Sequence, residues 1–126
     1  MEIVRRNYPE LPSPSGAFHH SVRVGNFLFI AGFTARGTAA EDGDINAQTE
    51  TILQNLQRVL AAEGGSLRNV VKVNVYTTDA GRVSDYREMA HRYFEPDHCP
   101  TSTMVEVTKL MHPKAKIEIE AIAVLP

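Results

Sequence analysis

The stretch that decides the fold is Lys116–Val124, which reads KIEIEAIAV. Apolar and charged residues alternate in its first half with the period of two that belongs to a β-strand covered on one face. Ile117 and Ile119 are expected to point toward a core, whereas Glu118 and Glu120 are expected to point away from it. The sequence therefore predicts a sheet that carries a core on one face and two carboxylates on the other.

The rest of the chain alternates between strand-like and helix-like patterns. Apolar residues from Ile52 to Leu60 recur at the spacing of a helix, and Gly-Asn between apolar β-formers is a typical hairpin turn. Residues 34–44 are small and polar and are expected to form a loop. The predicted elements are, in chain order, a short N-terminal strand, a hairpin over residues 21–31 that Gly32 ends, a helix from an N-cap at Asn46 to Gly64-Gly65, a strand over 70–76, a helix over 82–94, and strands over 101–109 and 116–124.

These elements form one α+β domain over residues 1–126. Two helices are too few to cover both faces of a sheet with this many strands, so both are expected to pack on one face. The face that carries Glu118 and Glu120 then needs another cover. The obvious candidate is a further copy of the same chain.

Composition narrows the class of protein. Apolar residues make up 43% and charged residues 22% of the 126 residues, as in ordinary soluble domains. No apolar run reaches the ~18–20 residues of a membrane span, and the N-terminus lacks a signal-peptide core, so a cytoplasmic protein is expected. A formal charge of −2 argues against nucleic-acid binding. Cys99 is the one cysteine, and no histidine spacing suggests a site, so neither a metal nor a cofactor is expected.

Five stretches occur in an order that points to a known family: Arg23–Asn26, Phe29–Gly32, Asp44–Thr49, Val105–Val107 and Ile117–Ala123. Together they resemble the RidA/YjgF superfamily of reactive-intermediate deaminases, and the resemblance extends over nearly the whole chain. It implies a chorismate-mutase-like fold and a homotrimer in which the sheets face inward around a barrel-like core. It also implies three clefts between neighbouring subunits.

The resemblance further implies an activity, with one important departure. Family members with known activity hydrolyse imines or enamines, and an arginine on the penultimate strand binds the substrate carboxylate. Ser102 stands at that position here, so this chain is a divergent member. Phe18, Phe33 and Met104 also replace usual pocket residues and are expected to line a more apolar substrate-binding cleft. The sequence around His20 is more weakly similar to the 2-aminomuconate deaminase branch.

The candidate catalytic residues are Glu118, Glu120 and His20. A partly desolvated carboxylate has a raised pKa and suits acid–base chemistry, and the resemblance implies that one glutamate of this strand holds the hydrolytic water. The sequence leaves open which one. His19 and His20 point opposite ways if extended, so one of them, with His20 the candidate, is expected to face the cleft and move protons. The resemblance also implies that the Gly32 N–H binds carboxylates.

The function expected from this pattern is hydrolysis of an imine, an enamine or a related nitrogenous intermediate at clefts between subunits. A dehydratase or cyclase acting on such an intermediate is one alternative. A non-catalytic, ligand-binding trimer is another, supported by Ser102 in place of the arginine, and Arg23 is a candidate replacement for that lost cation. A ribonuclease is the third, against which the charge balance argues. The partners expected are a small-molecule substrate and two further copies of the chain.

Overall fold

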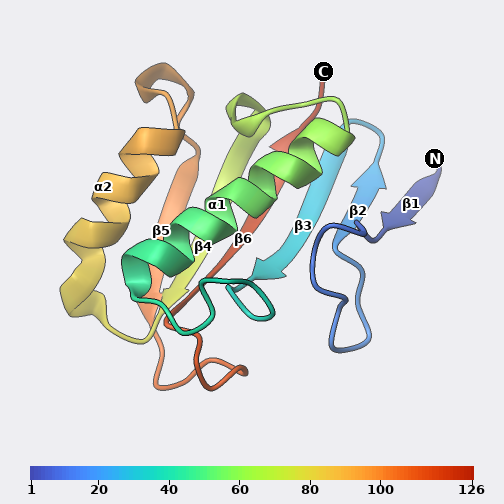
Figure 1. Ribbon diagram of the computed structural model, residues 1–126. Helices are drawn as coiled ribbons and strands as arrows, with labels where there is room; N and C mark the ends of the chain where they lie inside the picture. Colours follow the sequence, from blue (N-terminus) through green and yellow to red (C-terminus); the bar gives the residue numbers. More distant parts are fainter.

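One mixed sheet of six strands runs through the structure, a computed structural model that describes residues 1–126 (Figure 1). Its strands are β1 (Ile3–Arg6), β2 (Ser21–Val24), β3 (Phe27–Phe33), β4 (Val70–Thr77), β5 (Thr101–Glu106) and β6 (Ile117–Val124). Their order across the sheet is β1-β2-β3-β6-β4-β5. All neighbours are antiparallel except β4 and β5, which run parallel. β1 and β5 are therefore the two edges.

Two helices lie on the same face of this sheet, as the sequence predicts (Figure 1). They are α1 (Ile45–Ala62) and α2 (Val83–Tyr93), and three single 3₁₀ turns span Leu67–Asn69, Ala80–Arg82 and Pro96–His98. The α+β fold with both helices on one side is thus confirmed. Neither helix combines the length and apolarity that a membrane crossing requires.

Several element ends differ from the sequence prediction. The N-cap of α1 is Asp44 rather than Asn46, because the Asp44 side chain accepts a hydrogen bond from the Ala47 N–H at 2.9 Å. The strand expected over 101–109 ends at Glu106, whose partner Thr77 is the last residue of β4. A strand cannot continue past the end of the neighbour that pairs with it, so residues 107–116 form a connecting turn.

The core lies between the helices and the sheet. Leu53 and Leu56 of α1 and Ile117 and Ile119 of β6 have no exposed surface. Each side chain of this size stabilises the folded state by roughly 1.5–3 kcal/mol when it is fully buried. The alternation of the last strand is therefore confirmed: its isoleucines face the helices.

The opposite face of the sheet has no helix over it. Large apolar side chains on that face, among them Ile3, Phe27, Phe29 and Val105, remain between 44% and 50% exposed. Their strand partners place them on the same side as Glu118 and Glu120. We call this surface the open face. A row of half-exposed aromatic and branched side chains of this kind is typical of a surface that associates with another protein.

A β-bulge interrupts the pairing between β3 and β6. Ile30 pairs with Ala121 and Phe33 with Ile119, so three steps along β3 correspond to two along β6. The extra residue lies at Ala31-Gly32, and β3 continues through Gly32 to Phe33 instead of ending at Gly32. Bulges re-aim side chains beside functional sites. Here the bulge brings the Gly32 backbone against Glu118.

Candidate active site

A cleft of about 480 Å³ opens at the end of β3, between the loop over residues 9–18 and the turn over residues 107–116. Five residues predicted from the sequence line it: Phe18, His20, Gly32, Phe33 and Glu118. Its other lining residues are Leu11, Pro12, Pro14, Ser15, Thr34, Arg36, Asn55, Met111 and His112. Half of the lining residues are therefore polar or charged, and the other half are apolar side chains, prolines and a glycine.

The carboxyl of Glu118 is the unpaired acid of this cleft. The side chain is half-buried, and it makes neither a hydrogen bond nor an ion pair with any other residue. Burial raises the pKa of Glu118 above its ordinary value, and the nearby charge of Glu120 raises it further. A carboxyl with a raised pKa keeps its proton to higher pH than a free glutamate does, which suits a group that must donate a proton and take one back.

Gly32 makes room for that carboxyl. A Cβ atom at residue 32 would lie 2.9 Å from Cδ of Glu118, closer than real Cβ atoms approach other atoms. The glycine therefore allows the Glu118 carboxyl to rest against the backbone of the bulge. The bulge and the glutamate form one unit at the floor of the cleft.

Glu120 lies on the same strand face but outside this cleft. Its Oε1 atom accepts hydrogen bonds from Asn74 Nδ2 at 3.0 Å and from the Tyr76 hydroxyl at 2.9 Å. The hydrogen bond to Glu120 is the main reason why the pKa of Tyr76 is raised. Of the two candidate glutamates, Glu118 is therefore the one that lies free in the cleft.

His20 lines the cleft, but both of its ring nitrogens are engaged. Nδ1 accepts a hydrogen bond from the Tyr8 N–H, and Nε2 lies 2.9 Å from the Pro12 carbonyl oxygen. An amide N–H only donates and a carbonyl only accepts, so the imidazole is neutral with its proton on Nε2. In this geometry His20 holds the loop over residues 9–18 in place. His19 is exposed and does not line the cleft.

Ser102 and Met104 lie away from Glu118 in this chain. They pair with Val73 and Val75 of β4, whose side chains are buried on the helix side of the sheet. Ser102 is exposed, and Met104 packs against the core. The structure therefore separates these two predicted substrate-binding residues from the other three.

Sequence reasoning missed the cleft residues that follow β3 and those on α1. Arg36 lines the cleft from the loop after β3, and its Nη2 donates to the Ser13 carbonyl at 2.8 Å. Asn55 of α1 accepts a hydrogen bond from Arg58 at 2.6 Å. The proposed replacement cation, Arg23, instead lies 3.6 Å from Glu63, so it is committed elsewhere.

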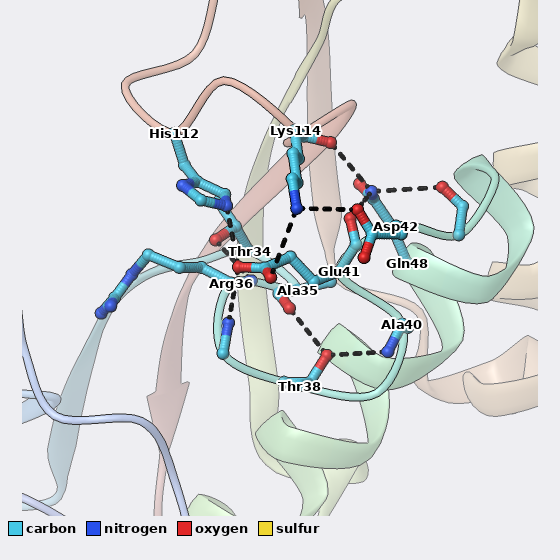
Figure 2. Close-up of polar contacts among 12 residues, drawn as sticks. Thr34, Ala35, Arg36, Thr38, Ala40, Glu41, Asp42, Gln48, His112 and Lys114 are labelled. Carbon is cyan, nitrogen blue, oxygen red and sulfur yellow. Dashed lines mark hydrogen bonds and ion pairs between the residues drawn. The ribbon is translucent and has the colours of Figure 1, made fainter.

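A polar network joins the loop over residues 34–44 to the turn over residues 107–116 (Figure 2). Glu41 accepts from the Gly37 N–H at 3.1 Å and lies 3.0 Å from Nε2 of His112, and Lys114 pairs with Asp42 at 2.9 Å. The Gly37 hydrogen bond is the main reason why the pKa of Glu41 is lowered. The loop before α1 and the turn before β6 are thereby tied together beside the cleft.

Gln48 extends this network into the core. Its amide donates to the Lys114 carbonyl at 3.0 Å and accepts from the Lys116 N–H at 2.9 Å. The side chain has no exposed surface, so these bonds satisfy a fully buried amide. The start of β6, and with it Glu118, is therefore anchored to the first turn of α1.

Comparisons with known protein sequences agree with one another on the relatives of this chain. The family model described as Endoribonuclease L-PSP matches residues 9–125. A RutC family protein of Pyrococcus horikoshii is 40% identical over 116 residues, which are 89% of this chain and 90% of that protein. The mitochondrial protein mmf2 of Schizosaccharomyces pombe is 36% identical over 116 residues, 88% of this chain and 90% of that protein.

Solved structures agree with these sequence matches. The crystal structure of a putative endoribonuclease from Thermotoga maritima is 36% identical, with a TM-score of 0.86 over 98% of this chain and 99% of that one. A Mycobacterium tuberculosis member of the YjgF/YER057c/UK114 family is 30% identical, with a TM-score of 0.79 over 98% and 100%. The chain therefore belongs to the Endoribonuclease L-PSP family, within the RidA/YjgF superfamily.

Proposed function

We propose that the protein hydrolyses an imine or enamine to a carbonyl compound and ammonia, with Glu118 as the acid–base group. The observation that carries the proposal is the unpaired, half-buried Glu118 carboxyl with its raised pKa, held against Gly32 in a lined cleft. Perturbed carboxyls in clefts are frequent catalytic groups. Membership of the RidA/YjgF superfamily supports the same reaction class.

The reaction needs one water and one group that moves protons. The protonated Glu118 carboxyl donates its proton to the imine nitrogen, or to the terminal carbon of an enamine. The resulting carboxylate takes a proton from the water that attacks the C=N carbon. The carboxyl, which now holds the proton from water, passes it to the carbinolamine nitrogen. As the C–N bond breaks, Glu118 takes the hydroxyl proton and is protonated again, so ammonia leaves, a carbonyl group forms and one water is consumed for each ammonia released.

The cleft walls favour a substrate with an apolar part. Phe18 lines the cleft and is 45% exposed, and Met111, another lining residue, is fully exposed. A substrate with an apolar portion would remove part of this apolar surface from water when it binds. The substrate proposed is therefore a small nitrogenous intermediate with an apolar or planar portion.

We further propose a cytoplasmic homotrimer that associates through the open face. Phe27 and Phe29 need a cover, and a neighbouring chain is the cover that the superfamily fold suggests. The name of one relative, mmf2, places that relative in mitochondria, so cell fractionation is the test of location.

The activity test uses 2-aminoacrylate and 2-aminomuconate, each generated in solution, with ammonia release as the measured rate. We expect acceleration with at least one of them. Glu118→Gln should lower the rate by roughly 10²–10⁴-fold, the usual contribution of a positioned acid–base group. Glu120→Gln should retain most activity, and exposed Glu2→Gln is the matched control.

Other results would favour the alternatives. Absence of acceleration with both substrates, or an unchanged rate in Glu118→Gln, would refute the hydrolase. A changed substrate without ammonia release would indicate a dehydratase or cyclase. Salt-sensitive cleavage of single-stranded RNA would favour the ribonuclease activity that the family description names.

A further inference from the structure

The cleft contains a cation that no other residue neutralises. Arg36 lines the cleft together with Glu118 and Phe18, and its side chain is partly buried. It forms no ion pair, in contrast to Arg6, Arg68, Arg82 and Arg92, which all lie within 4.0 Å of a carboxylate. A charged side chain that lines a cleft and has no counter-charge is suited to bind an anion.

Most hydrogen-bond donors of Arg36 are unused. A guanidinium has five N–H donors. The structure commits one nitrogen, Nη2, to the Ser13 carbonyl at 2.8 Å, and no other protein acceptor contacts the side chain. The remaining donors have the planar, paired geometry that fits the two oxygens of a carboxylate.

The same contacts hold Arg36 in position before a ligand arrives. Its backbone N–H donates to the Thr34 hydroxyl at 3.2 Å, and the Ser13 contact fixes the end of the side chain. Figure 2 shows the side chain extending away from the cluster of Glu41 and Lys114, so those groups do not compete for it. A cation that is already ordered binds its partner with less loss of side-chain entropy.

No other cleft residue offers an equivalent charge. His112 lies 3.0 Å from Glu41, which occupies its Nε2, and the imidazole of His20 is neutral and doubly hydrogen-bonded. Arg36 is therefore the permanent positive charge of the cleft. Glu118 supplies the acid–base group from the other side.

We propose that Arg36 binds the carboxylate of the ligand in this cleft, and that the apolar part of the ligand packs against Phe18. The inference rests on the proposed function for the identity of the cleft as the substrate site. It adds the residue: Arg36 pairs with the charge of the ligand in a chain that has Ser102 on its penultimate strand. The charge of the ligand thus orients it relative to Glu118.

A binding experiment without turnover tests this inference. Benzoate and benzamide have the same shape but differ in charge, and their affinities for the full-length protein can be measured by calorimetry. We expect benzoate to bind more tightly than benzamide. Arg36→Gln should weaken benzoate binding by roughly 10- to 100-fold and leave benzamide binding unchanged, as for loss of a charge-assisted hydrogen bond.

Two further variants complete the design. Arg36→Lys keeps the charge but not the paired donors, and it should fall between the wild type and Arg36→Gln. Arg87→Gln removes an exposed arginine of α2 that forms no ion pair, and it should bind both probes like the wild type.

Two outcomes would overturn the inference. Equal affinity of the wild type for benzoate and benzamide would mean that the cleft has no anion site. An equal loss of both affinities in Arg36→Gln would mean that Arg36 only holds the loop that contains Ser13. Because neither probe is hydrolysed, failure of the deaminase assay with Arg36-dependent benzoate binding would refute the proposed reaction and leave the anion site standing.

Discussion

At the residue scale, Glu118 is held in the folded protein in a way that favours its protonated form. Its carboxyl is half-buried, has no partner, and shares a strand face with Glu120. The charged form is therefore less stable in the folded chain than in water. Functional sites commonly carry such an unfavourable group because the chemistry requires it.

Glu118→Gln should consequently stabilise the fold, and the gain should depend on pH. The folded pKa of Glu118 is raised above the ordinary value of 4.5. Below that value the carboxyl is protonated in both states, so the variant and the wild type should be equally stable. As the pH rises through the folded pKa, the wild type loses stability relative to the Glu118→Gln variant, whose amide does not titrate.

Urea unfolding at about pH 4 and about pH 7.5 measures this difference at fixed protein concentration. The wild type should be less stable than Glu118→Gln at the higher pH only. Exposed Glu2→Gln is the control and should follow the wild type at both pH values. The same stability difference at both pH values would show that shape or packing, and not charge, determines the effect.

Gly32→Ala should damage activity more than stability. The new methyl group would lie 2.9 Å from Cδ of Glu118, and the atom in its way is the mobile end of a side chain. The carboxyl can turn away, so the loss of stability should be about 1 kcal/mol or less. Ammonia release should fall strongly because the carboxyl is misplaced. The double variant with Glu118→Gln should then be no slower than Glu118→Gln alone, whereas additive losses would contradict the shared role.

At the element scale, local hydrogen bonds decide where α1 begins and how β6 is anchored. Asp44 caps the helix through the Ala47 N–H, and Gln48 in the first turn bonds the chain on both sides of Ala115. The first turn of α1 thus positions both the loop before it and the strand that carries Glu118. A less stable first turn of α1 should therefore change the position of Glu118 in the cleft.

The cap can be tested with two neighbouring variants. Asp44→Ala should lower the free energy of unfolding by about 1 kcal/mol, the usual value for a lost N-cap. Asn46→Ala is the control, since Asn46 lies inside the helix and its side chain makes no capping bond. Urea unfolding of the two variants distinguishes them. A larger loss for Asn46→Ala would contradict the assignment of Asp44 as the cap.

At the scale of the whole molecule, helices cover only one face of the sheet. The helices cover the centre of one face, while Phe27 and Phe29 on the open face stay half exposed. The predicted association of chains follows from this asymmetry.

Phe29→Glu should therefore separate the assembly. A charge in the middle of an apolar contact is costly to desolvate, so light scattering should give three chain masses for the wild type and one for the variant. Gln57→Glu adds the same charge on the exposed side of α1 and should leave the mass unchanged. A single-chain mass for the wild type at micromolar concentration would refute the trimer.

The features that were predicted correctly from the sequence are those that depend on local sequence patterns. The alternation of Lys116–Val124 placed Glu118 on the face away from the helices, and the periodicity of residues 52–60 located α1. Gly25-Asn26 marked the hairpin. These features depend on residues close together in the chain, so they follow from side-chain period and turn chemistry.

The contacts between polar groups follow from the tertiary structure and not from local sequence patterns. The bulge at Ala31-Gly32 is set by the pairing of two strands that lie far apart in the chain, and β5 ends where its neighbour β4 ends. The ring of His20 is engaged by the Tyr8 N–H and the Pro12 carbonyl. Arg36 lines the cleft from a loop, and its side chain is held by the Ser13 carbonyl. Contacts of this kind depend on non-local register and loop closure, which no short sequence pattern encodes.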